Sequence, residues 1–91
     1  MMEKKELQLE VPEHIDITQY SNLVIISFNE DEFIIDFARV MPGNRNPRIV
    51  SRIILNPRNA KRLAGLLSNN IVEYEKKFGV IILPEFGKDA H

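Results

Sequence analysis

Residues 21–55 read SNLVIISFNEDEFIIDFARVMPGNRNPRIVSRIIL, and this segment predicts a β-sheet. It contains three runs rich in β-branched and aromatic residues, at 21–28, 33–41 and 48–55, a composition typical of strands. A polar turn at 29–32 separates the first two runs, and a loop with two prolines and a glycine separates the second from the third. Such connections favour antiparallel neighbours, because their residues supply turns and cannot belong to a sheet interior.

The flanking segments add a fourth strand and a helix. Residues 7–11 alternate apolar and polar side chains up to Pro12, which is the period of a half-buried strand. On the other side, Asn56 and Pro57 predict a helix start, since asparagine caps free amides and proline suits the first helical position. Apolar residues then recur every three or four positions, at Ala60, Leu63, Leu67, Ile71, Tyr74 and Phe78. Gly79 is expected to end the helix in a left-handed conformation.

The predicted fold is α+β: a four-stranded antiparallel sheet followed by one long C-terminal α-helix, in the order ββββα. A chain of 91 residues and 10.6 kDa has room for a single domain. Within it we distinguish an N-terminal strand and acidic connector (1–19), a core of strands and helix (20–79) and an apolar C-terminal tail (80–91). The tail is an extra strand, an arm that reaches a partner, or a segment packed on its own sheet.

Composition limits the cellular setting and the chemistry. There is no cysteine, so disulfides and thiolate metal sites are excluded, as fits a reducing cytosol. The longest wholly apolar runs are four residues, whereas a membrane helix needs about twenty. We expect a cytoplasmic protein without a membrane partner. The two histidines, His14 and His91, have no neighbours at metal-ligand spacing. We predict no enzyme activity, no catalytic residue, no metal and no cofactor.

Pairing the strands across their turns gives a sheet that is apolar on both faces. One face, assigned to the core beneath the helix, carries Val24, Ile26, Phe28, Phe33, Ile35, Phe37, Ile53 and Leu55. The opposite face is also largely aliphatic, with Asp36 and Arg52 placed opposite each other as an ion pair. A second copy of the chain is the simplest cover for this face, so we expect a two-fold homodimer. Its candidate interface is Leu23, Ile25, Ile34, Asp36, Val50, Arg52 and Ile54.

The net charge of −1 conceals an asymmetric distribution. Residues 1–36 hold nine acids and two bases, a balance of −7, and residues 37–72 hold seven bases and no acid, a balance of +7. Two interpretations remain open. Either the acidic half folds against the basic half, or the basic segment binds an anionic partner. For the second, the candidate anion or nucleic-acid contacts are Arg45, Arg48, Arg58, Lys61 and Arg62.

Several motifs between Tyr20 and Gly79 resemble one small prokaryotic family, domain-of-unknown-function family 3467. They are Tyr20-Ser21-Asn22, residues 32–37, Met41-Pro42-Gly43, residues 51–55, Pro57, residues 60–63, Asn70-Ile71, Tyr74-Glu75 and Phe78-Gly79. The resemblance implies a compact single domain and brings no activity, ligand or catalytic residue with it. The segment after Gly79 is expected to be particular to this chain.

These observations favour a non-enzymatic homodimeric binding or adaptor domain that engages a protein partner. The alternative is a single-stranded DNA- or RNA-binding protein that uses the arginine-rich loop and the helix N-terminus, where anions are favoured. Strands followed by a long helix are similar in topology to Pur-type and Whirly-type single-stranded nucleic-acid binders. The same plan is similar to SecB-like export chaperones, which bind unfolded chains.

Overall fold

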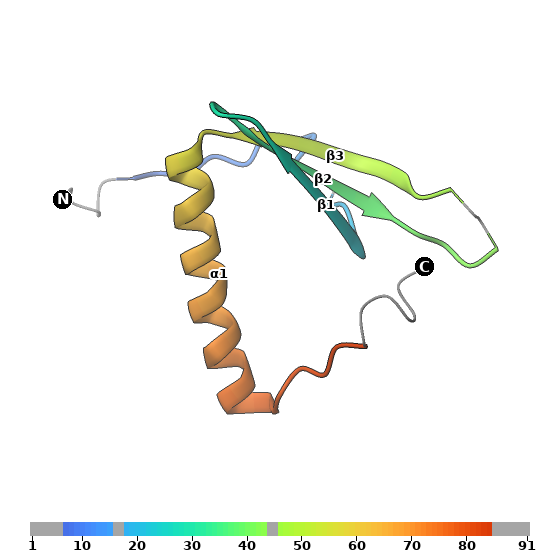
Figure 1. The fold of residues 1–91 in the computed structure, drawn as a ribbon, viewed down its shortest axis with the longest axis vertical. Helices are drawn as coiled ribbons and strands as arrows, with labels where there is room; N and C mark the ends of the chain where they lie inside the picture. The colour runs from blue at the N-terminus through green and yellow to red at the C-terminus, as the bar shows by residue number, and fades with distance from the viewer. Residues whose placement is uncertain (1–6, 16–17, 44–45, 85–91) are drawn as a thin grey trace. The chain divides into compact units, whose positions relative to one another are not determined.

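The computed structural model describes residues 7–15, 18–43 and 46–84. Its elements are β1 (Leu23–Phe28), β2 (Phe33–Arg39), β3 (Arg48–Leu55) and α1 (Pro57–Phe78), in that order (Figure 1). The strands form one antiparallel sheet in the order β1-β2-β3. The predicted α+β class, with an antiparallel sheet followed by one helix, is therefore confirmed. The predicted number of strands, four, is wrong, because the described residues form three.

The missing strand is the one predicted at residues 7–11. These residues have no regular structure, and the side chains of Leu7, Leu9 and Val11 are largely exposed. Alternation of apolar and polar residues makes a segment suitable for a sheet, but a strand forms only when its backbone finds a partner. In the described part of the chain the sheet ends at β1 and β3, and this segment is not part of it.

β1 begins two residues later than predicted, because at residues 21 and 22 side chains form hydrogen bonds with the backbone at the end of the neighbouring strand. The Asn22 side-chain amide donates to the carbonyl of Val40 at 3.0 Å and accepts from the Val40 N–H at 2.8 Å, as a peptide group would. The Ser21 hydroxyl lies within hydrogen-bond distance of the carbonyl oxygens of Leu23 (3.0 Å) and Ala38 (2.9 Å). The polar side chains thus satisfy backbone groups at the end of the sheet.

The turn between β1 and β2 fixes the register of the hairpin. The side-chain oxygen of Asn29 accepts from the N–H groups of Asp31 (2.8 Å) and Glu32 (2.9 Å), an arrangement typical of asparagine in turns. The Asn29 N–H donates to the Glu32 carbonyl at 3.0 Å. The rings of Phe28 and Phe33 stack with centroids 5.4 Å apart. These contacts agree with the predicted pairing of Phe28 with Phe33.

The helix has the predicted bounds and N-cap. The Asn56 side chain accepts from the Asn59 N–H at 2.7 Å, and Pro57 occupies the first helical position. In the middle of α1, the side chain of Asn70 donates to the Leu66 carbonyl at 2.8 Å, so this polar residue is accommodated without ending the helix. The conformation predicted for Gly79 was wrong in detail. Its φ of 103° and ψ of 163° lie outside the left-handed helical region, in a positive-φ conformation reached essentially by glycine alone.

The chain divides into two compact units, and each strand contributes to both. Among the described residues, the first unit contains β1 up to Ile26, β2 from Ile35 onward and β3 up to Ile53. The second contains the hairpin turn with its flanking residues, the end of β3, α1 and the residues that follow it to Pro84. Buried hydrophobic side chains among the described residues occur only in the first unit, at Ile35 and Ala38.

The residues predicted to form the core of the single chain belong to both units and differ in their exposure. Of the eight sheet residues among them only Ile35 is buried, while Phe33, Phe37 and Leu55 are half-buried. The other four, Val24, Ile26, Phe28 and Ile53, are exposed. The helix has no buried residue, although its apolar spacing is as predicted. Periodicity identifies a face suited to burial, but burial requires a second packed layer.

Candidate interaction surface

One side of the sheet in the first unit combines aliphatic side chains with an ion pair. Strand alternation places Leu23, Ile25, Asp36, Ala38, Val50 and Arg52 on this side. We call these six residues the Asp36 face. All of them except Ala38 belong to the predicted dimer interface, and the structure brings them together on three neighbouring strands.

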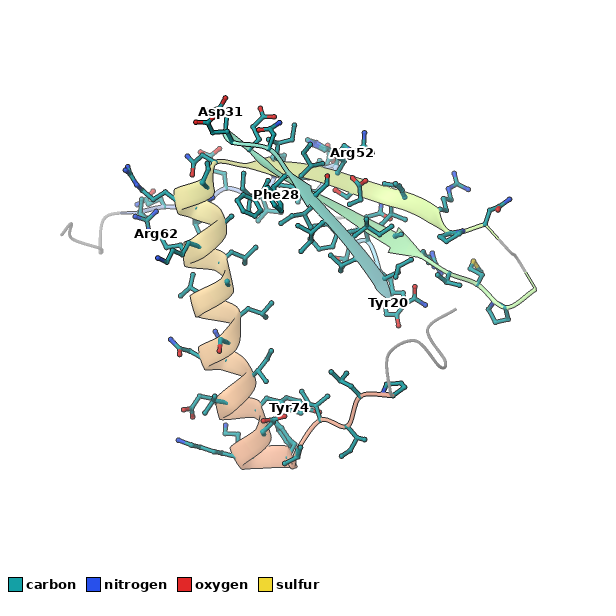
Figure 2. All side chains as sticks on the ribbon, in the orientation of Figure 1. Tyr20, Phe28, Asp31, Arg52, Arg62 and Tyr74 are labelled. Carbon is teal, nitrogen blue, oxygen red and sulfur yellow. The ribbon has the colours of Figure 1, made fainter. Side chains whose placement is uncertain are left out.

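The ion pair at the centre of the Asp36 face has a two-pronged geometry. Arg52 donates from Nε to Oδ1 of Asp36 at 2.6 Å and from Nη2 to Oδ2 at 2.9 Å. This confirms the predicted placement of the two residues opposite each other. The carboxylate is buried, whereas the arginine side chain is 62% exposed and projects from β3 (Figure 2). Two parallel bonds fix the guanidinium in orientation, so it presents its remaining N–H groups to the surface.

The two partners stabilise each other in their charged forms. The hydrogen bond from Arg52 lowers the pKa of the Asp36 carboxyl below its ordinary 3.8, with burial acting in the opposite sense and the arginine charge adding to the lowering. The hydrogen bond to Asp36 correspondingly raises the pKa of Arg52. The pair therefore stays ionised at neutral pH, and the Asp36 face carries no net charge.

The aliphatic residues around this pair are only partly covered. Ala38 is fully buried, Leu23 and Val50 are half-buried, and Ile25 is 49% exposed. The remaining predicted interface residues, Ile34 and Ile54, belong to the second unit. There Ile34 is half-buried and Ile54 is exposed. Each unit thus presents aliphatic surface of the kind that other proteins bury in interfaces.

The predicted basic contacts are distributed over both units. Arg48 is exposed at the start of β3 in the first unit. Arg58, Lys61 and Arg62 are exposed in the first turns of α1 in the second unit, and Figure 2 shows Arg62 at this end of the helix. Arg45 lies outside the described residues. The described residues therefore include four of the five bases, one in the first unit and three in the second.

Two of the three bases at the start of α1, Arg58 and Lys61, line an open hollow. Asn56, Pro57, Arg58 and Lys61 border a volume of about 590 Å³. The first turn of the helix has no acidic residue, so the two bases and the positive end of the helix dipole act in the same direction there. Arg62 does not line this hollow.

Two contacts in the structure were not predicted from the sequence. The guanidinium of Arg39 lies 6.0 Å from the centroid of the Tyr20 ring, a cation–π distance. After the helix, the N–H of Ile81 donates to a carboxylate oxygen of Glu75 at 3.0 Å, which ties the tail to the last turn of α1. Neither contact has a local sequence signal, because each depends on how the chain turns between the partners.

No group of three or more histidine, cysteine, aspartate or glutamate side chains in the described ranges is placed to hold a metal ion. No helix within residues 7–15, 18–43 and 46–84 combines the length and apolar character needed to cross a bilayer.

The structure defines a small α+β protein with a three-stranded antiparallel sheet and a C-terminal helix. Residues 1–83 match the family described as Protein of unknown function (DUF3467), and the chain belongs to this family. The resemblance seen in the sequence is thereby confirmed. The match continues past Gly79, so residues 80–83 are not particular to this chain. No curated protein and no solved structure matches the chain.

Proposed function

We propose that this protein is a non-enzymatic homodimeric binding domain, in which a second copy covers the Asp36 face and the remaining apolar surface engages a protein partner. The observation that carries the proposal is the aliphatic surface left uncovered on the Asp36 face, where Ile25 is 49% exposed and Leu23 and Val50 are only half-buried around the Asp36–Arg52 pair.

Such a surface is of the kind that an interface covers. A standard interface buries about 800 Å² on each partner, and obligate dimers bury more. Exposed aliphatic side chains occur in each unit, since Ile25 of the first unit is 49% exposed and Ile54 of the second is 54% exposed. At about 25 cal/mol per Å² of apolar surface, covering them supplies a driving force for association.

The ion pair suits such an interface. Asp36 and Arg52 neutralise one another within one chain, so covering the face does not bury a net charge, which is the costly case. The exposed N–H groups of Arg52 need acceptors once water is removed. In a two-fold arrangement the Asp36 carboxylates of the two copies supply them reciprocally, which favours one orientation of the copies.

Single-stranded nucleic-acid binding is the second candidate. The hollow lined by Arg58 and Lys61 at the helix N-terminus favours it, because backbone amides and bases there attract phosphate. Pure phosphate contacts of this kind weaken steeply with salt.

The experiment that separates the two candidates is the mass of the purified protein in solution, recorded with its absorbance ratio at 260 and 280 nm. Self-association predicts a multiple of 10.6 kDa with the ratio of pure protein. A particle of 10.6 kDa at every concentration contradicts the dimer. A raised ratio that falls on washing in high salt supports the nucleic-acid candidate instead.

A further inference from the structure

The two edges of the sheet differ in their protection against pairing with another strand. The strand order places β1 and β3 at the edges. β3 carries Arg48 and Arg52 and is flanked by Pro47 and Pro57. Charged side chains and prolines are the usual means by which an edge strand resists pairing. The β3 edge is therefore protected against pairing with a further strand.

β1 has none of these devices. Its sequence is LVIISF, without a charge, proline or glycine, and every residue from Val24 to Phe28 is exposed. The strand has six residues, which is the ordinary length of a paired strand. A neutral, exposed edge of this kind is a template for a further strand.

The hydrogen-bonding direction along β1 follows from its turn. The Asn29 N–H donates across the hairpin to Glu32, so residue 29 faces β2. Backbone groups alternate in direction along an antiparallel strand, so Ser27, Ile25 and Leu23 also face β2. The N–H and C=O groups of Val24, Ile26 and Phe28 consequently face the open edge.

We propose that β1 of a second copy pairs antiparallel with this edge, which joins two three-stranded sheets into one of six strands. The inference rests on the proposed self-association and adds a second contact to it. The occupant is a second copy because the edge is neutral and already extended in every copy, so two such strands match each other without repulsion or rearrangement.

Symmetry restricts the register of this pairing. Residues directly opposite each other must lie on the same side of the joined sheet, and a slip by one residue would break that match. A register centred on Ile26 places Ile26 opposite itself and Val24 opposite Phe28 of the second copy. All three outward-facing residues of each strand then pair. This register uses the free backbone groups most completely.

The edge contact and the Asp36 face are two distinct self-complementary surfaces. When the two-fold axes of two such surfaces are perpendicular and intersect, the copies close into a tetramer with dihedral symmetry, whereas one surface gives a dimer. A three-stranded sheet is about 14 Å wide at ~4.8 Å per strand. Joining two sheets at their β1 edges doubles this width, and the other two copies then cover the Asp36 faces of the joined sheet. Two of the homodimers proposed above then join through their β1 edges, so we expect four copies in the wild-type particle.

Ile26→Pro tests the edge contact. Proline is tolerated on an edge where the N–H points to solvent, so the sheet of each chain is retained, but an incoming strand loses its donor. The expected result is a fall from four copies to two by light scattering, with unchanged circular dichroism. Ile26→Ala, which keeps the N–H, is expected to remain at four copies. If Ile26→Pro has the same mass as the wild type, the edge contact is refuted.

The remaining outcomes separate this inference from the proposed function. A wild-type dimer that Ile26→Pro leaves intact overturns the edge contact and leaves the proposed function standing. A wild-type monomer overturns both. If removal of residues 80–91 alone reduces four copies to two while Ile26→Cys forms no link between copies, the tail occupies the edge and the proposal is wrong.

A cysteine scan tests the register directly, because the chain has no cysteine of its own. In the proposed register the two copies of residue 26 have Cα atoms about 5.5 Å apart, within the range of a disulfide. The two copies of residue 27 are displaced by two residues, about 6.8 Å along the strands, so their Cα atoms are about 8 Å apart, beyond that range. Ile26→Cys should therefore cross-link under mild oxidation and Ser27→Cys should not. Cross-linking of Ser27→Cys but not of Ile26→Cys contradicts the register.

Discussion

Truncation of Ile25 offers a quantitative test of the Asp36 face. Ile25→Ala removes three carbons, which contribute about 0.8 kcal/mol each when fully buried. The residue is 49% exposed in the single chain, so about half of this, roughly 1.2 kcal/mol, is gained on association. Each copy contributes once, and the two together give about 2.4 kcal/mol, or about a 50-fold higher Kd for the face contact.

The matched control is Ile53→Ala. Ile53 lies in the same unit, is 43% exposed and belongs to the opposite side of the sheet. The same three carbons are removed, but we expect the Kd to change less than about threefold. Sedimentation equilibrium over a dilution series measures both constants. The measurement is made in the Ile26→Pro background, where only the face contact remains. An equal or larger effect of Ile53→Ala refutes the assignment of the face.

Three further predictions concern the ion pair, the helix cap and the basic hollow. Because the folded-state pKa of Asp36 is lowered below 3.8, its contribution to stability is present above that pH and is lost as the pH falls through the lowered value. The difference in urea midpoint between the wild type and Asp36→Asn should therefore be constant from pH 8 to about 4 and shrink in stronger acid. A difference that shrinks between pH 7 and 5 contradicts this. Asn56→Ala should cost about 1 kcal/mol of unfolding free energy, with Asn56→Ser retaining most of it, and equal losses in the two variants count against the cap. The double change Arg58→Glu and Lys61→Glu should leave the mass unchanged and abolish any low-salt oligonucleotide binding seen by fluorescence anisotropy; binding that persists excludes the hollow as its site.

The helix was predictable because its signals are local. Asn56 and Pro57 sit side by side at its start, Gly79 follows its last turn, and the apolar spacing lies between them. The N-cap bond joins residues only three positions apart. Such contacts form within one stretch of chain, so the sequence pattern contains both partners.

The missing strand and the exposed residues of the helix show where this reasoning stops. Residues 7–11 have the period of a strand, but pairing depends on a distant backbone that the pattern does not specify. The side chain of Asn22 pairs with Val40, eighteen residues away, and no local rule gives that contact. Similarly, the spacing of Leu67 and Ile71 marks an apolar stripe, yet both are exposed because periodicity does not say which layer covers it.

The candidate site was predictable in part. Alternation and turn length were enough to place Asp36 opposite Arg52, and the structure gives that pair two hydrogen bonds. The grouping of the bases into one anion-binding surface stays a prediction. Arg48 and Arg58 are ten residues apart and belong to different units.

Methyl contacts between copies test the central claim most directly. A mixture of isoleucine-methyl ¹³C-labelled and unlabelled chains is dissociated, reassembled and studied by isotope-filtered NOE spectroscopy. If a second copy covers the Asp36 face, the methyl groups of Ile25 show NOEs to the unlabelled copy and those of Ile53 do not. NOEs between copies at Ile53 with none at Ile25 contradict the account, as does a sample without any such NOEs.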